Sequence, residues 1–258
     1  MALLSVRGLT VRYGSFLALD GVSFDITAGQ VVAIIGPNGA GKTTCFNAIN
    51  GQRPPNSGSV LLDGRDVTGR SPEALFRLGV GRTFQITATV ASMTVRENVQ
   101  MALISHRRRQ RALWPAARGL YVDEANALLA SVEMGAQADR ACGVLAYGDL
   151  KRLELAVALA NRPKLLLMDE PTAGMAPPER SRLMTLAWTL ARERNIGVLF
   201  TEHDIDIVFF RADHIAVLNR GQLVAAGTPE AIRNNRQVQE IYLGGGALGA
   251  ESAAVASS

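Results

Sequence analysis

The chain has 258 residues, of which 48% are hydrophobic and 19% are charged, and its formal net charge is +4 at pH 7. This composition suffices for a buried core, as one domain of two lobes or as two small domains, and the modest charge does not by itself indicate nucleic-acid binding. No stretch approaches the roughly 18 apolar residues of a membrane-spanning helix, and the start MALLSVRG is too short an apolar run for a signal peptide. Two isolated cysteines, Cys45 and Cys142, favour a reducing compartment, so a cytoplasmic protein is expected.

The first predicted elements are short strands that lead into a glycine-rich loop. Strands are predicted at 22–26 and 31–35, and residues 34–45 read IIGPNGAGKTTC, with a helix predicted over 42–50. The loop carries the G-x-x-x-x-G-K-T pattern, in which glycines let backbone N–H groups turn toward a phosphate at the helix N-terminus. We expect Lys42 to reach the β- and γ-phosphates of a nucleotide and the Thr43 hydroxyl to bind Mg²⁺.

A helical stretch follows one more strand, which is predicted at 59–62. Ser71, followed by Pro72, is expected to cap a helix, and Thr94 with Glu97 forms a predicted capping box. From about residue 94 to 160 the apolar residues have helical spacing, which predicts a helical insert. Within it, the basic run HRRRQR at 106–111 is either a solvated surface or a contact with a partner or with anionic lipid head groups.

Strands and helices alternate again in the last third of the chain. Thr228 is the expected cap of another helix, and the small-residue tail 244–258 is expected to be disordered. The predicted strands of this region are 165–168, 198–201 and 215–218. The alternation predicts an α/β protein with a mostly parallel sheet that is covered on both faces.

Polar residues at the ends of these later strands complete a candidate nucleotide site. Asp169 and Glu170 end one apolar strand, where the first acid is expected to hold Mg²⁺ through water and the second to polarise an attacking water. His203 follows the next strand and is a candidate to hydrogen-bond a γ-phosphate. Gln85 is an amide able to bind Mg²⁺ or water, and Tyr13 either stacks on a base or packs on the sheet.

A second glycine-bearing turn, LAYGD at 145–149, precedes a second predicted helix. The N-terminus of that helix is another place to receive a phosphate. Because one nucleotide does not need two such helix ends from one chain, we infer that this end serves the nucleotide of a partner chain.

In their order along the chain, these segments resemble the ATP-binding subunits of ABC transporters, and the resemblance extends from Leu3 to Gly244. It implies a P-loop NTPase fold, with a RecA-like core, a small antiparallel β subdomain and a helical subdomain at about 90–160. These would form one nucleotide-binding domain over 1–243. The implied activity is ATP hydrolysis, with ATP and Mg²⁺ bound between two chains that close head to tail.

The resemblance also implies roles for individual residues. ATP-binding residues are expected to be Tyr13, Gly36, Pro37, Asn38, Gly39, Ala40, Gly41, Lys42, Thr43 and Thr44. Catalytic residues are expected to be Gln85, Glu170 and His203, and Mg²⁺ is expected at Thr43, Gln85 and Asp169. The signature motif, which would face the partner's ATP, is expected at Leu145, Ala146, Tyr147, Gly148 and Asp149.

Within the family, stretches such as GVGRTFQ, TVRENV and LAYGDLKRLELA look like the branched-chain amino acid uptake type. This implies a second ATP-binding subunit, identical or different, with permease subunits and, indirectly, a periplasmic solute-binding protein as partners, and no nucleic acid. The implied location is the cytoplasmic face of the inner membrane. The alternative is a soluble ABC-type ATPase such as an iron–sulfur assembly scaffold component, which would share the same motifs.

Two departures from the common family pattern are visible. The common signature is Leu-Ser-Gly-Gly-Gln, so Ala146 lacks a hydroxyl, and Asp149 adds a negative charge that is expected to weaken phosphate binding there. Ala176 stands where many relatives carry aspartate, so coupling between subunits through that carboxylate is not expected.

Overall fold

The protein is described here from a computed structural model, which covers residues 2–83, 89–107 and 119–243. Three sequence-based expectations lie outside the described residues: the roles of Gln85, most of the basic run at 106–111, and the disorder of the tail at 244–258. Among the described residues, no helix is both long enough and apolar enough to cross a membrane.

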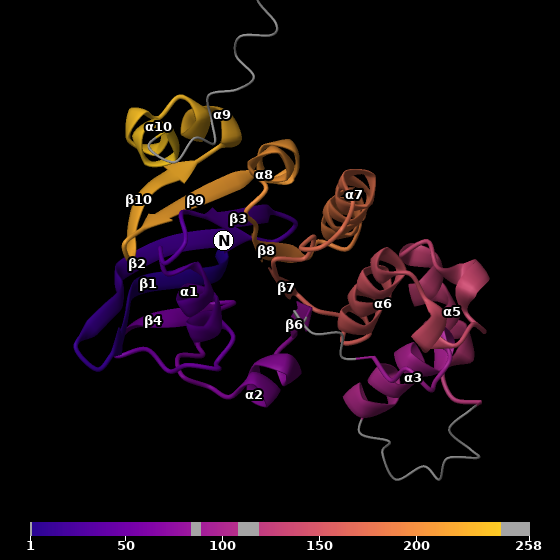
Figure 1. Cartoon of the computed structure of the whole chain (residues 1–258). Helices are drawn as coiled ribbons and strands as arrows, with labels where there is room; N and C mark the ends of the chain where they lie inside the picture. The colour runs from indigo at the N-terminus through magenta and orange to yellow at the C-terminus, as the bar shows by residue number, and fades with distance from the viewer. Residues whose placement is uncertain (1, 84–88, 108–118, 244–258) are drawn as a thin grey trace, which may run out of the picture.

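A four-stranded antiparallel sheet forms one layer of the molecule (Figure 1), in the order β2-β1-β4-β5. Its strands are β1 (Ala2–Tyr13), β2 (Phe16–Thr27), β4 (Ser57–Leu62) and β5 (Arg65–Asp66). The strand β1 was not predicted from the sequence. Its register shifts between Val6 and Leu9 and again between Leu9 and Val11, so its apolar residues do not alternate regularly.

A six-stranded sheet forms the centre, in the order β10-β9-β3-β8-β7-β6. Its strands are β3 (Val31–Ile35), β6 (Val80–Thr83), β7 (Leu165–Asp169), β8 (Gly197–Thr201), β9 (His214–Asn219) and β10 (Gln222–Gly227). All neighbours are parallel except β9 and β10, which confirms the predicted mostly parallel sheet. The four-residue strand β6 and the edge strand β10 were not predicted.

Both faces of the central sheet are covered, so β3, β7 and β8 are buried at every residue. On one face Val32 and Ile34 pack against the antiparallel sheet and the helix α1 (Lys42–Ile49). On the other face Val31 and Ala33 pack in one cluster with residues of the helical subdomain and of the helices that follow β7, β8 and β10. Those helices include α7 (Pro177–Glu193), α8 (Ile205–Arg211), α9 (Pro229–Arg233) and α10 (Arg236–Leu243).

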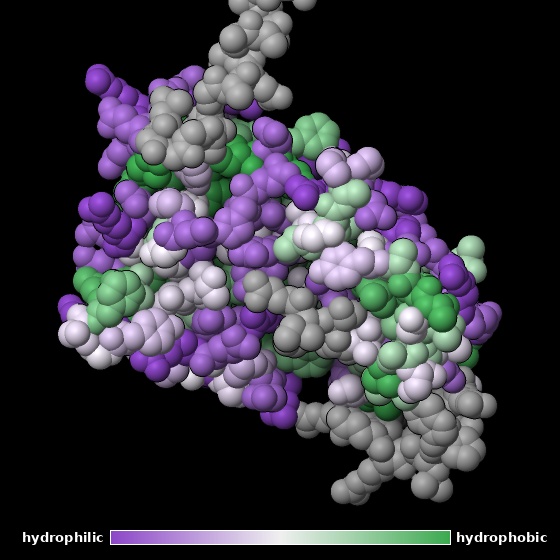
Figure 2. Space-filling model, in the orientation of Figure 1, coloured by the Kyte–Doolittle hydropathy of each residue, from purple (hydrophilic) through white to green (hydrophobic). Residues whose placement is uncertain are grey.

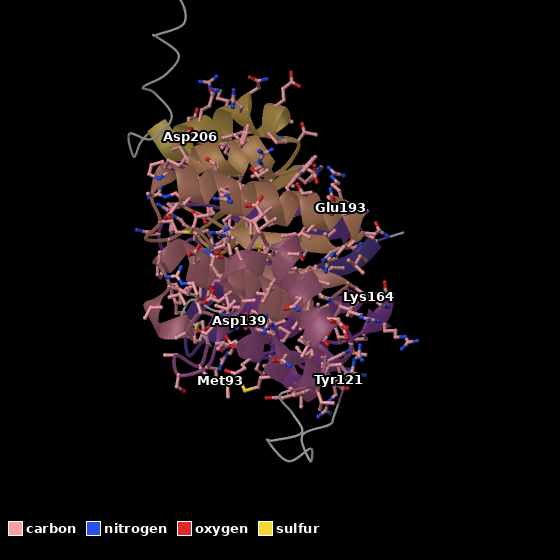
Figure 3. All side chains as sticks on the ribbon, turned by 90° about the vertical axis from the view of Figure 1, so that its right-hand side faces the viewer. Met93, Tyr121, Asp139, Lys164, Glu193 and Asp206 are labelled. Carbon is pink, nitrogen blue, oxygen red and sulfur yellow. The ribbon has the colours of Figure 1, made fainter. Side chains whose placement is uncertain are left out.

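A group of helices lies to one side of the sheets (Figure 1) and forms the helical subdomain. It contains α3 (Val95–His106), α5 (Val122–Ser131), α6 (Tyr147–Leu159) and two 3₁₀ turns, Gly135–Gln137 and Cys142–Val144. Figure 3 faces this side, with Met93, Tyr121 and Asp139 in its lower half and Asp206 of α8 near the top. Figure 2 shows hydrophobic residues at the surface over this group of helices.

The predicted helix starts are present with their hydrogen bonds. The Ser71 hydroxyl accepts from the Ala74 N–H at the start of α2 (Pro72–Arg77), and Thr228 caps α9. Thr94 and Glu97 form the complete capping box of α3. These local patterns place the helices, and the parallel strands then bring the carboxyl ends of β3, β7 and β8 to one edge of the sheet, where ligands bind in such folds.

Candidate functional site

The phosphate loop (residues 36–44) joins β3 to α1 and passes very close to its neighbours. Gly36 has φ +152, and a Cβ there would lie 2.1 Å from the Leu218 carbonyl oxygen. Gly41 has φ +103, and a Cβ there would lie 2.7 Å from the Ala18 carbonyl oxygen. At both positions a side chain is excluded by backbone atoms as well as by the dihedral angle. The loop can therefore present its backbone N–H groups at the N-terminus of α1, as a phosphate requires.

Lys42, the first residue of α1, is buried with its ammonium inside this loop. Its Nζ donates to the carbonyl oxygen of Gly36 at 2.7 Å and to that of Pro37 at 3.1 Å. Burial lowers the pKa of Lys42 below its usual value, and the nearby Glu170 and Asp169 carboxylates oppose that shift. The cation is thus held at the place where the pattern predicts a phosphate contact.

Asp169 ends β7 as a buried carboxylate. Its Oδ1 accepts from the Thr201 hydroxyl at 2.7 Å, and its Oδ2 lies 3.9 Å from Nη2 of Arg82. Carboxylate and hydroxyl oxygens are the ligands that Mg²⁺ prefers. A carboxylate at the end of this strand, oriented by its hydrogen bond with Thr201 and close enough to Lys42 to affect its pKa, fits the predicted role in holding that ion.

Glu170 follows in a left-handed conformation, with φ +46, that turns its side chain out of the strand direction. Its backbone N–H donates to the Thr201 hydroxyl at 3.0 Å and so fixes the turn. Its Oε1 lies 2.8 Å from Nε2 of His203, the residue that follows β8 by two positions. The structure therefore brings together two of the predicted catalytic residues, which are 33 positions apart in the chain.

A pocket of about 290 Å³ lies over the phosphate loop and contains most of the predicted nucleotide-binding residues. It is lined by Tyr13, Phe16, Ala18, Asn38, Gly39, Ala40, Gly41, Lys42, Thr43, Thr44, Glu170 and His203. Tyr13 is 45% exposed and Phe16 is 64% exposed, so both aromatic rings are accessible to a ligand rather than packed in the core. Phe16 was missed in the sequence, although its place two residues after the Tyr13-Gly14 turn is a usable signal.

The signature segment (residues 145–149) lies at the start of α6 and does not line this pocket. Tyr147 is 43% exposed, and a Cβ built on Gly174 would lie 3.6 Å from its ring. Asp149 is mostly buried, pairs with Arg152 and accepts from Nε2 of Gln137 at 3.2 Å. From the sequence we expected an uncompensated negative charge at Asp149. In the structure Arg152 neutralises this charge within the helical subdomain.

The residues beside the site that the sequence did not single out are Thr201 and Glu202. The Thr201 hydroxyl bonds the Asp169 carboxylate and accepts from the Glu170 N–H, and Glu202 is a buried carboxylate next to His203. Their only sequence signal is that polar residues end an otherwise apolar strand. Gln85 lies outside the described residues, so its predicted role stays a prediction.

The chain is similar to known proteins over nearly its whole length. The chain matches the family described as "ABC transporter" over residues 19–173 and the one described as "Branched-chain amino acid ATP-binding cassette transporter" over residues 222–247. It is 40% identical over 257 residues to the high-affinity branched-chain amino acid transport ATP-binding protein BraF of Pseudomonas aeruginosa. That alignment covers 94% of this chain and 98% of the relative.

Two solved structures have the same fold. One is the ADP conformation of an ATP-binding cassette of an ABC transporter, with a TM-score of 0.83 and 32% identity, covering 95% of this chain and 99% of the other. The second is a dimeric post-hydrolysis state of an ATP-binding cassette bound to ADP and Pi. It has a TM-score of 0.72 and 26% identity and covers 88% of this chain and 98% of the other.

These matches confirm the resemblance and the P-loop NTPase fold with an antiparallel β subdomain. The alignments span nearly the whole chain, so the similarity is not limited to the segments that contain the motifs. The chain belongs to the ABC transporter family as an ATP-binding ATPase subunit of the branched-chain amino acid type.

Proposed function

We propose that this chain hydrolyses ATP in the pocket over the phosphate loop to drive an importer of branched-chain amino acids or a related small polar solute. The observation that carries the proposal is the meeting of the phosphate loop with the Glu170–His203 pair in one pocket. The similarity to BraF, a branched-chain amino acid transport protein by name, supports this class of solute. The chain itself contacts no transported solute in this proposal.

Each residue has a task set by its position. The backbone N–H groups of the phosphate loop and the Lys42 ammonium bind the phosphates, and the Thr43 hydroxyl with Asp169 holds Mg²⁺, which supplies charge neutralisation. Glu170 accepts a hydrogen bond from the attacking water. His203 contacts the Glu170 carboxylate and orients this carboxylate toward the γ-phosphate. The amide of Gln85 is the proposed further Mg²⁺ or water ligand.

The signature segment is the proposed contact with the nucleotide of a second subunit, identical or different. It stands on α6, away from the chain's own ATP pocket, which supports an action across a dimer. ABC cassettes dimerise, as the ADP- and Pi-bound relative shows. In this chain Ala146 caps α6 without a side-chain hydrogen bond, so the backbone N–H groups at the start of α6 are the donors offered to the partner's ATP.

A second, larger cleft is the proposed docking place for the permease subunits. It has a volume of about 930 Å³, lies between α2, α3 and α6, and includes Val80 and Arg82 of β6, the strand that precedes Gln85 in the sequence. Phe76 contributes a ring that is 36% exposed. Helices of the membrane subunits in this cleft would place the chain on the cytoplasmic face of the inner membrane, where ATP hydrolysis and phosphate release change the spacing of the two cassettes.

The experiment that tests the proposal compares Glu170→Gln with a matched control, Glu193→Gln, in the complex with the permease subunits. Glu193 is exposed at the end of α7 (Figure 3), so the same chemical change there leaves the ATP pocket untouched. We expect Glu170→Gln to bind ATP and to lose nearly all phosphate release, and Glu193→Gln to behave like the native chain.

Full phosphate release by the Glu170→Gln complex would contradict the catalytic assignment. Failure of the chain to co-purify with any membrane protein from its native cells would favour the soluble ABC-type ATPase instead. Uptake assays of reconstituted complexes with radiolabelled leucine then test the solute class directly.

A further inference from the structure

Two loops beside Glu170 and His203 are connected by a series of side-chain hydrogen bonds. Segment 201–204 begins at the last residue of β8 and faces segment 169–175, which begins at the last residue of β7. The Thr201 hydroxyl accepts from the Glu170 N–H, and His203 bonds the Glu170 carboxylate. Between these two contacts, Glu202 lies in the interior, only 5% exposed, and its Oε1 accepts from the Thr172 N–H at 2.9 Å and from the Thr172 hydroxyl at 2.7 Å.

Burying the Glu202 carboxylate costs free energy, because burial disfavours its charged form. Burial raises the pKa of Glu202, the hydrogen bonds from Thr172 and His203 oppose that rise, and the neighbouring Glu170 charge adds to it. Thr172 is itself 2% exposed, so its two donors have no access to water and depend on Glu202. Neither residue lines the ATP pocket.

The same loop is held at its other end by a second contact. Arg180 of α7 donates through Nε to the Met175 carbonyl oxygen at 2.6 Å and through Nη1 to Asp204 at 2.9 Å. The 172–175 loop is therefore held at one end by Glu202 directly and at the other end by Arg180, which also binds Asp204. Gly174, in the middle of that loop, lies against the ring of Tyr147, the first residue of α6.

We propose that Glu202 is a positioning residue for ATP hydrolysis, which anchors Thr172 and thereby fixes Glu170 on one side and the loop under Tyr147 on the other. The proposal rests on the assignment of Glu170 as the catalytic carboxylate. Because Ala176 has no carboxylate, the contact of Glu202 with Thr172 provides a link, within one chain, between the ATP pocket and the signature segment that serves the partner.

The test uses two matched pairs of variants in the full chain, assembled with its native subunits. Thr172→Val keeps the shape and removes the hydroxyl donor, whereas Thr172→Ser keeps the donor. Glu202→Leu removes the acceptor, whereas Glu202→Gln keeps one side-chain oxygen for Thr172. The measurements are kcat and KM for ATP and the thermal unfolding midpoint of each variant.

We expect Thr172→Val and Glu202→Leu each to lower kcat about tenfold or more, since small displacements of a catalytic group have effects of this order. The KM for ATP should stay within about twofold, because the lost contact matters in the transition state and not in ATP binding. Thr172→Ser and Glu202→Gln should retain at least about half of the native kcat. The double variant Thr172→Val with Glu202→Leu should be no slower than Glu202→Leu alone, because Glu202→Leu already removes the hydrogen bond that Thr172→Val removes.

Three results would overturn the proposal: native kcat in Thr172→Val, equal loss in Thr172→Ser and Thr172→Val, or losses that multiply in the double variant. If Glu202→Leu does not fold, the two Thr172 variants alone decide the question. Glu170→Gln, measured alongside, separates the two assignments. If Glu170→Gln loses turnover while Thr172→Val keeps the native rate, only the proposed role of Glu202 is refuted. If Glu170→Gln keeps native turnover, the proposed catalytic role of Glu170 is refuted as well.

Discussion

The charge cluster behind the signature segment allows a quantitative prediction. Arg152 of α6 pairs with Asp149 one turn earlier, and it also donates through Nη1 to the Glu133 carbonyl oxygen at 3.2 Å. The Arg152 and Asp149 side chains are only 13% and 15% exposed. In Arg152→Gln the Asp149 carboxylate keeps a single partner, Nε2 of Gln137, and its charge is no longer neutralised.

The expected cost follows from that burial. Removing one partner of a fully buried ion pair costs about 3–5 kcal/mol. Partial exposure reduces this, and the shorter Gln side chain retains some hydrogen bonding, so we expect about 2–3 kcal/mol for Arg152→Gln. In Asp149→Asn the side-chain oxygen still accepts from Gln137 and Arg152 still contacts Glu133, so about 1 kcal/mol or less is expected.

The matched control is Arg182→Gln, which removes a guanidinium from an exposed pair. Arg182 and Glu133 are 59% and 49% exposed, and such pairs contribute about 0–1 kcal/mol. With roughly 2–4 °C per kcal/mol for a chain of this size, calorimetry should record a fall of about 4–12 °C for Arg152→Gln. Falls of less than about 4 °C are expected for Asp149→Asn and Arg182→Gln. A loss in Arg152→Gln no larger than in Arg182→Gln, or equal losses in Asp149→Asn and Arg152→Gln, would refute the reasoning.

Two further predictions concern the phosphate loop and the helix behind it. Lys42→Ala should weaken ATP binding about 10- to 100-fold, as the loss of a charge-assisted contact implies, and unchanged affinity by isothermal titration calorimetry would count against the loop assignment. Cys45 and Cys142 are both buried, and burial raises the pKa of Cys45 to about 12, so its thiol stays protonated at pH 8 in the folded chain. Iodoacetamide at pH 8 should therefore modify neither cysteine in the native chain and both in guanidinium, and mass spectrometry that finds native Cys45 rapidly alkylated would contradict its described burial.

The parts of the site that were predictable from the sequence are those whose chemistry is local. The phosphate loop is recognisable because its glycines, its lysine and the strand before it are contiguous in the chain. The capping box of Thr94 and Glu97 is recognisable for the same reason, since both hydrogen bonds close within one turn. The buried strand β7 was predictable from its run of apolar residues and its final acids.

The parts that were not predictable depend on distant or irregular pairing. The strand β10 is rich in small residues and pairs antiparallel at the sheet edge, so its composition does not indicate a strand. The bond of Thr172 to Glu202 joins residues 30 positions apart. Nothing in either local sequence indicates which other strand end the carboxylate will face, because that depends on the order of the strands in the folded sheet.

The unusual signature LAYGD is accompanied by matching features elsewhere in the same chain. Tyr147 has a ring where the common motif has a glycine, and the residue beneath it is Gly174, which has φ +78 and no side chain to displace the ring. Asp149 has a charge where the common motif has an amide, and Arg152 neutralises it away from the chain's own ATP pocket. Since each substituted side chain has its own partner, the altered motif keeps the N-terminus of α6 free of an uncompensated negative charge. This supports the proposed contact of the backbone N–H groups of α6 with a phosphate of the opposite subunit.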